Sequence, residues 1–170
     1  TGFKRYFKGK IVGELYTSLD QTDFSAEMAQ IRAANPEVVF QFHPGGLGIS
    51  FLRQYEQAGL TKEIPMGVAE PSMDGVILQS LGKAALGLNV SSHWNHDFDN
   101  PANKAFVEAW EKAYNRPLTS YAEQGYEAAL AYGAALKATG GSIEDLAAFP
   151  DAMRKADFQS VRGKFSFGPN

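Results

Sequence analysis

Two histidines and two aspartates lie close together in one short segment of the chain. His93, His96, Asp97 and Asp99 are residue types that bind metal ions. The segment is expected to connect a strand to a helix, and its spacing differs from the spacings of zinc sites. Polar loop residues and a helix cap explain the same pattern. The sequence therefore favours neither a metal site nor a cofactor here.

A glycine-rich turn, Gly45-Gly46-Leu47-Gly48, follows a predicted strand and opens a predicted helix. Backbone N–H groups at such a turn can bind an anion. The GxGxxG and GxxxxGK[ST] fingerprints are both absent from the sequence, which argues against a nucleotide. Two interpretations remain: a plain tight turn, or a turn that binds the carboxylate or another polar group of a ligand.

His43 and Glu70 each lie at the carboxyl end of a predicted strand, where parallel sheets bind their ligands. His43 is predicted either to contact a ligand or to be a structural histidine. A carboxylate at Glu70 could bind an ammonium or hydroxyl group, or could be a solvated loop residue. No serine, histidine and acid set stands out as a nucleophilic triad. Nothing in the sequence indicates catalysis, and we predict that the chain is not an enzyme.

The first part of the chain alternates between strand and helix patterns. Strands are predicted at residues 10–16, 37–42, 64–69 and 86–92, and helices at 23–34, 47–58 and 72–81. Repeated βαβ units indicate an α/β fold with a parallel sheet and flanking helices. Ligands would contact the loops that follow the strands, at residues 17–22, 43–48, 70–74 and 92–99.

The pattern changes after Asp97. Helices are predicted from Asn100-Pro101 onward, then at 120–138 and 145–156, and residues 161–167 alternate like a strand. This mainly helical segment has no sheet of its own to cover. We therefore predict a βα-repeat lobe at residues 1–97 and a helical segment at 98–170 that packs on something else.

Composition narrows the classes of function. The 170 residues suffice for a domain with a real core. The net charge of −3, without a long basic run, argues against nucleic acid as a partner. No apolar stretch approaches the roughly 20 residues that a membrane-spanning helix needs. The absence of cysteine excludes disulfides and thiolate metal sites.

Several segments, in order, resemble one family. They are Thr22-Asp23-Phe24-Ser25-Ala26, the run from Ile31 to Phe40, Leu52-Arg53-Gln54, Ala58-Gly59-Leu60, Asn100-Pro101-Ala102-Asn103, Gly125-Tyr126-Glu127-Ala128-Ala129, and residues 156–167. Together they resemble the second lobe of the periplasmic leucine/isoleucine/valine-binding proteins of ABC importers. The resemblance implies a type I periplasmic-binding fold with two α/β lobes. It also implies that the chain is a fragment, with residues 98–170 returning to a first lobe that is absent.

The resemblance further implies a small organic acid as ligand, an ABC permease as membrane partner, and a periplasmic or membrane-anchored extracytoplasmic location. The ligand-binding candidates are Phe42, His43, Gly45, Glu70 and Tyr121. The family's aromatic position falls near Pro44 and its glutamate position at Ala69. These departures favour an aromatic carboxylate, with a branched-chain or other amino acid as the alternative.

Two other functions remain open from the sequence: a ligand-sensing domain of the same fold in a receptor or regulator, and a Rossmann-like or flavodoxin-like enzyme. The second lacks its glycine fingerprint. Because half the cleft would be missing, residues 1–170 alone are expected to bind ligand weakly or not at all. Self-association through the helices of residues 98–170 would cover their exposed apolar faces.

Overall fold

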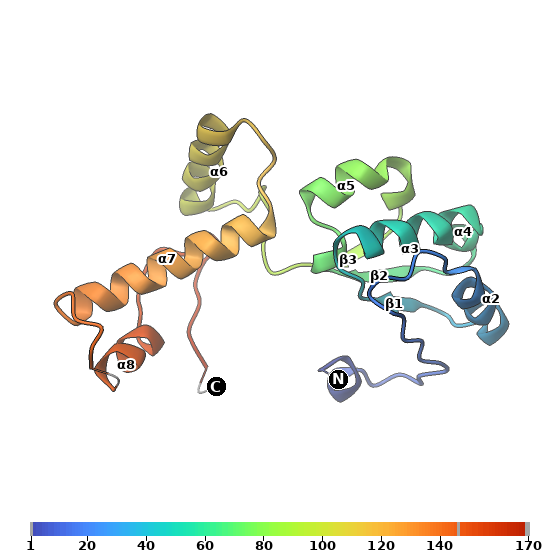
Figure 1. Ribbon diagram of the computed structural model, residues 1–170, viewed down its shortest axis with the longest axis horizontal. Coiled ribbons are helices and arrows are strands. Elements are labelled where there is room, and N and C mark those ends of the chain that lie inside the picture. Colours follow the sequence, from blue (N-terminus) through green and yellow to red (C-terminus); the bar gives the residue numbers. More distant parts are fainter. Residues whose placement is uncertain (1, 146, 169–170) are drawn as a thin grey trace. The chain divides into compact units, whose positions relative to one another are not determined.

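The computed structural model describes residues 2–145 and 147–168, and the chain divides into two compact units, Thr1–Ser91 and Ser92–Asn170 (Figure 1). The sequence placed this boundary after Asp97. Residues 92–97 belong instead to the second unit, where the Trp94 side chain is buried in the apolar core.

The first unit is a parallel α/β structure. Its elements are α1 (Gly2–Tyr6), α2 (Ser25–Ala34), β1 (Val39–Gln41), α3 (Gly45–Gln57), α4 (Leu60–Glu63), β2 (Met66–Ala69), the 3₁₀ turn η1 (Glu70–Ser72), α5 (Gly75–Leu81), the 3₁₀ turn η2 (Gly82–Ala85) and β3 (Asn89–Ser91). The strands lie in the order β1-β2-β3, and both pairs are parallel. The predicted α/β class is confirmed.

The core of this unit lies between the sheet and helices α2, α3 and α5. Met66 and Val68 alternate inward along β2, as expected for a half-buried strand. They meet Phe24 and Met28 from the α2 region, Phe51, Leu52 and Tyr55 from α3, and Ile77 and Leu81 from α5. The opposite face of the sheet carries Phe40, which is 45% exposed and stacks on Phe3 of α1.

Helix ends in the first unit follow local chemistry. Asn35 ends α2 in the left-handed conformation, and Gly59, with φ +77°, separates α3 from α4, where a C-terminal glycine was predicted. The Asp74 carboxylate accepts hydrogen bonds from the Val76 and Ile77 amides and thereby caps α5.

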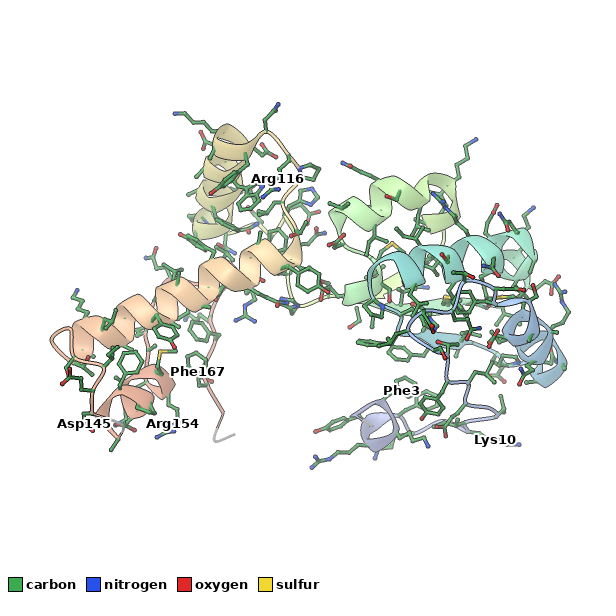
Figure 2. All side chains as sticks on the ribbon, in the orientation of Figure 1. Phe3, Lys10, Arg116, Asp145, Arg154 and Phe167 are labelled. Atoms are coloured by element: carbon green, nitrogen blue, oxygen red, sulfur yellow. The ribbon has the colours of Figure 1, made fainter. Side chains whose placement is uncertain are left out.

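The second unit contains α6 (Pro101–Tyr114), α7 (Ser120–Ala138) and α8 (Ala148–Arg154). Asn100 caps α6 through the Asn103 amide, and Thr119 caps α7 through the Ala122 amide. The buried core is small and consists of Trp94, Phe106, Leu118 and Val161. Aromatic side chains remain exposed along α7, namely Tyr121, Tyr126 and Tyr132. Figure 2 draws the side chains of the described residues on the ribbon.

Two predicted strands are wrong. Residues 10–16 and 161–167 form no strand in the structure. A β-rich sequence becomes a strand only when its backbone N–H and C=O groups pair with a neighbour. Within the described part of the chain, the sheet pairs only β1, β2 and β3. Of the predicted helix at 145–156, residues 148–154 are helical, and Leu146 lies outside the described residues.

Candidate functional site

Four of the five predicted ligand-binding residues lie at the carboxyl edge of the sheet in the first unit. Gln41, the last residue of β1, is in register with Val68 of β2, so the segments that follow the two strands leave the same edge. Phe42, His43 and Gly45 follow β1, and Glu70 follows β2. Parallel sheets bind ligands at this edge.

The His43 side chain is hydrogen-bonded and packed within the first unit. Its Nε2 lies 3.0 Å from the Thr17 hydroxyl, and its Nδ1 lies 2.9 Å from Nε2 of Gln41. Because an amide nitrogen donates, Nδ1 accepts, and the neutral ring then donates from Nε2 to Thr17. The ring also packs against Phe24 and Phe51. Burial lowers the pKa of His43, while Glu27 acts in the opposite direction, so the neutral form is favoured.

The backbone of His43 is bound as well. The His43 amide donates to the Ser72 hydroxyl at 2.9 Å, and that hydroxyl donates to the His43 carbonyl. Ser72 belongs to η1, directly after β2. The loop after β1 is therefore hydrogen-bonded to the loop after β2.

The other three residues at this edge differ in exposure. Phe42 is 61% exposed and presents an aromatic ring to the solvent. Gly45 begins α3 with φ +55°, a conformation that favours glycine, and no side chain caps this helix. Its first N–H groups are thus available to an anion. Glu70, at the first position of η1, is half-buried.

Tyr121 belongs to the second unit. It lies in the first turn of α7 and is 57% exposed. Sequence reasoning weighed a cleft contact against core packing for this residue. The exposed ring does not belong to the core of its own unit, and its role as a ligand contact stays a prediction.

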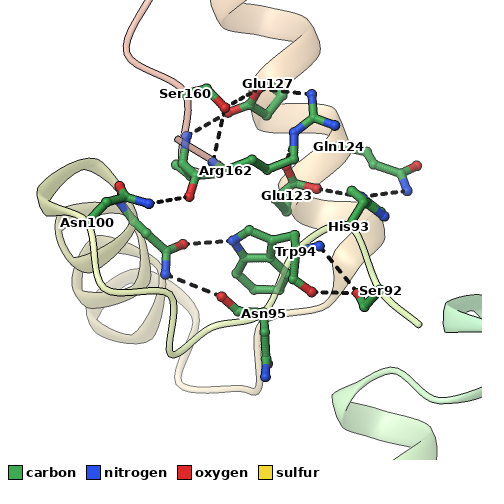
Figure 3. Close-up of polar contacts among 12 residues, drawn as sticks. Ser92, His93, Trp94, Asn95, Asn100, Glu123, Gln124, Glu127, Ser160 and Arg162 are labelled. Atoms are coloured by element: carbon green, nitrogen blue, oxygen red, sulfur yellow. Dashed lines mark hydrogen bonds and ion pairs between the residues drawn. The ribbon is translucent and has the colours of Figure 1, made fainter. Parts of the chain in front are cut away.

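A second polar cluster lies wholly within the second unit (Figure 3). Glu123 and Glu127 are four residues apart on α7, so their side chains share one helix face, and they are 0% and 5% exposed. Arg162 lies between them, with Nε 3.4 Å from Glu123 and a terminal nitrogen 3.4 Å from Glu127. His93 Nε2 lies 3.1 Å from the other Glu123 oxygen.

Hydrogen bonds in and around this cluster connect four segments of the second unit. Glu127 accepts from the Val161 amide at 2.8 Å and from the Ser160 hydroxyl at 3.0 Å. Asn100 donates to the Val161 carbonyl. The Trp94 indole donates to Asn103 of α6 at 2.7 Å. Hydrogen bonds thus link the residues after the unit boundary to α6 and to α7, and link the segment 160–162 to α7 and to the cap of α6.

Two buried carboxylates, those of Glu123 and Glu127, face one guanidinium, that of Arg162. Burial raises the pKa of Glu123, against the opposing effects of His93 and Arg162, and the nearby charge of Glu127 raises it further. The geometry suits a structural junction, because its carboxylates are covered and paired.

Sequence reasoning singled out neither Thr17, Gln41 and Ser72 at the sheet edge nor the paired glutamates of α7. Gln41 was detectable as a polar residue between the apolar Phe40 and Phe42 of a predicted strand. Glu123 and Glu127 were detectable as an acidic pair at helical spacing among alanines. Thr17 and Ser72 carry no comparable local signal.

Two of the metal-type residues of the segment 93–99, His93 and Asp99, pair with other side chains. His93 contacts Glu123, and Asp99 forms an ion pair with Lys104. Over residues 2–145 and 147–168, no group of three or more metal-binding side chains comes together. In the same residues, no helix has the length and apolar character needed to cross a membrane.

A hollow of about 590 Å³ also occurs in the second unit. It is lined by the start of α6, at Asn100–Ala102, and by side chains between Ala156 and Phe165. None of the predicted ligand-binding residues lines it. We therefore place the candidate site at the sheet edge and not in this hollow.

A parallel α/β unit with polar and aromatic residues gathered at its carboxyl edge has the arrangement in which such sheets commonly bind small molecules. A sequence model of the periplasmic binding protein family matches residues 1–170. The chain therefore belongs to the periplasmic binding protein family, as the resemblance indicated.

Solved structures agree with this assignment. An ABC-transporter solute-binding protein from R. palustris, in complex with benzoate, is 33% identical to this chain, with a TM-score of 0.90. The match covers 99% of this chain and 47% of the R. palustris chain. A substrate-binding protein from Sphaerobacter thermophilus is 30% identical, with a TM-score of 0.78 and coverages of 88% and 42%. Another from R. palustris, in complex with 4-hydroxybenzoate, is 25% identical, with a TM-score of 0.85 and coverages of 98% and 47%.

The chain thus spans about half the length of these relatives. No protein of curated function matches it. The family match and the solved relatives are solute-binding proteins, which supports this class over the Rossmann-like or flavodoxin-like enzyme that the sequence left open.

Proposed function

We propose that this chain is part of the extracytoplasmic solute-binding component of an ABC importer, and that its ligand is a small aromatic carboxylate. It would bind the solute without transforming it and deliver it to a membrane permease. The observation that carries the proposal is the 33% identity, over 99% of the chain, to a solute-binding protein in complex with benzoate.

The chemistry of the sheet edge supports an aromatic ligand. Phe42 presents a largely exposed ring beside the loop that opens α3. Stacked aromatic pairs gain about 0.5–1.5 kcal/mol beyond the area they bury. The uncapped N-terminus of α3 at Gly45 favours a negatively charged group such as a carboxylate.

Glu70 supports a ligand that also carries a hydrogen-bond donor. A carboxylate would repel the acid group of the ligand but would accept from a hydroxyl or an ammonium group. A hydroxybenzoate with its ring on Phe42 and its acid toward α3 could direct a ring hydroxyl to Glu70. His43 would support the loop that carries Phe42.

The test is isothermal titration calorimetry on the complete gene product that carries this sequence, with benzoate, 4-hydroxybenzoate and leucine. We expect tighter binding of the aromatic acids than of leucine. The Phe42→Ala variant should bind them about tenfold more weakly, which corresponds to roughly 1.4 kcal/mol of lost stacking.

Phe40→Ala is the matched control. Phe40 is also an exposed phenylalanine, one strand position from Gln41, but it stacks on Phe3 on the sheet face. Its removal should leave affinity unchanged. Preference for leucine would reject an aromatic ligand, and equal affinities of the Phe42 and Phe40 variants would reject Phe42 as a contact.

A further inference from the structure

We propose that Ser72 is a positioning residue of the candidate ligand site, because its hydroxyl fixes the loop after β1 to the loop after β2. The inference rests on the proposed function and deepens it. Ser72 would determine how tightly a ligand is bound without touching the ligand itself.

The Ser72 hydroxyl is buried and hydrogen-bonded inside the protein. Ser72 is 0% exposed. Its hydroxyl accepts from the His43 amide at 2.9 Å and donates its single hydrogen to the His43 carbonyl. It therefore has neither an exposed surface nor a spare hydrogen for a ligand.

A third segment packs on the same point. A Cβ added at Gly48, in the first turn of α3, would lie 2.5 Å from the His43 carbonyl oxygen and 3.4 Å from Cβ of Ser72. The backbone of Gly48 is not in the left-handed region. Glycine is thus needed here for space, so that α3 can approach the loop that Ser72 holds.

The contact sets the separations among the candidate ligand groups. Phe42 precedes His43, the N–H groups of α3 follow it, and Glu70 lies two residues before Ser72. One buried hydroxyl thus joins the segments that carry the ring, the anion-binding helix end and the carboxylate. A site whose groups are held in place before binding avoids the cost of ordering them on binding.

The experiment compares Ser72→Ala with Tyr55→Phe. Tyr55 is 1% exposed and donates a 2.9 Å hydrogen bond to the Ile64 carbonyl. Each substitution removes one buried hydroxyl that donates to a backbone carbonyl in the same unit. Only Ser72 joins the two ligand loops, so Tyr55→Phe reproduces the loss of stability without the loss of positioning.

Two measurements are made on the complete gene product, well below the melting temperature of every variant. One is the dissociation constant for 4-hydroxybenzoate. The other is the hydrogen-exchange rate of the His43 amide without ligand. Ser72→Ala should weaken binding about tenfold, the equivalent of one lost hydrogen bond. It should also accelerate exchange at His43, while Tyr55→Phe changes neither.

Equal dissociation constants for the two variants, or unchanged exchange at His43 in Ser72→Ala, would overturn the proposal. If Ser72→Ala does not fold, Ser72→Cys keeps the shape with a weaker hydrogen-bonding group and should show smaller changes of the same sign; its absence of change would be equally decisive. If the wild type binds no aromatic acid, the proposed function fails. The hydrogen-exchange rate of the His43 amide then decides whether Ser72 couples the loops.

Discussion

Replacing Glu127 by alanine should destabilise the second unit more than any surface substitution. The Glu127 carboxylate is 5% exposed and has three partners: the Val161 amide at 2.8 Å, the Ser160 hydroxyl at 3.0 Å and the Arg162 guanidinium at 3.4 Å. Val161 is itself 0% exposed, so its amide cannot turn to water for a replacement.

The expected cost follows from those partners. Removing one member of a buried ion pair costs about 3–5 kcal/mol, and an unsatisfied buried amide accounts for about 1–3 kcal/mol of such a loss. The Arg162 side chain is 37% exposed, so water relieves part of its charge. We therefore expect the lower end, about 3 kcal/mol, a large fraction of the roughly 5–15 kcal/mol of a typical domain.

Urea unfolding followed by tryptophan fluorescence measures this cost. Within residues 1–170 the two tryptophans, Trp94 and Trp110, both belong to the second unit, so the fluorescence of this chain reports that unit. Glu108, on the exposed side of α6, supplies the control, because Glu108→Ala should change stability by no more than about 0.5 kcal/mol.

Glu127→Gln separates hydrogen bonding from charge. The amide oxygen of glutamine can still accept from the Val161 amide, but the pairing with Arg162 is lost, so an intermediate cost of about 1–2 kcal/mol is expected. If Glu127→Ala costs no more than Glu108→Ala, the cluster does not hold the unit together and the reasoning is refuted.

Three further predictions concern protonation and space. Because folding raises the pKa of Glu123, this residue stabilises the folded state below the ordinary carboxyl pKa of about 4.3, and that stabilisation is lost as pH rises through the folded pKa. Urea unfolding across this range should show a weaker dependence of stability on pH for Glu123→Gln than for the wild type. Parallel pH profiles of the two proteins would contradict this prediction. The lowered pKa of His43 has the opposite consequence: stability is full above about 6.5 and falls as pH drops through the folded pKa, so NMR titration of the ring should give a midpoint below that of a free histidine. Gly48→Ala should lower the unfolding free energy by about 1–3 kcal/mol, because its Cβ would meet a backbone oxygen, whereas Gly46→Ala has nothing within 4 Å and should be tolerated in thermal denaturation.

The starts and ends of α6 and α7 could be predicted because capping residues next to each helix end determine them. Residues 120–138 were predicted as helical and form α7, which starts at a Thr119 cap and ends before two glycines. Asn100 and Pro101 likewise start α6 where their types indicate. Capping depends on a few adjacent residues, so one sequence contains the whole signal.

Strands could not be predicted with the same success, because a strand depends on a neighbour. Residues 10–16 and 37–42 both have β-rich sequences. Only the second segment contributes a strand, β1, because Val39, Phe40 and Gln41 meet a hydrogen-bonding partner in β2. Periodicity reports which side chains would share a face, not whether another strand lies alongside.

The sheet edge shows the same limit at the level of single residues. The sequence placed His43 and Glu70 at strand ends, where ligands bind, and left His43 open between a ligand contact and a structural role. In the structure Thr17 and Gln41 engage both ring nitrogens and Ser72 engages the backbone, across separations of 26, 2 and 29 residues. Contacts between residues 26 and 29 positions apart cannot be predicted from the spacing of neighbouring residues.

Those contacts redistribute the expected roles at the site. A histidine with both ring nitrogens bonded inside the protein has little left to offer a ligand, yet it holds the strand end from which Phe42 projects. The groups open to a solute at this edge then include an exposed ring and the N–H groups of an uncapped helix. An aromatic ring with a carboxylate is the ligand chemistry that uses both.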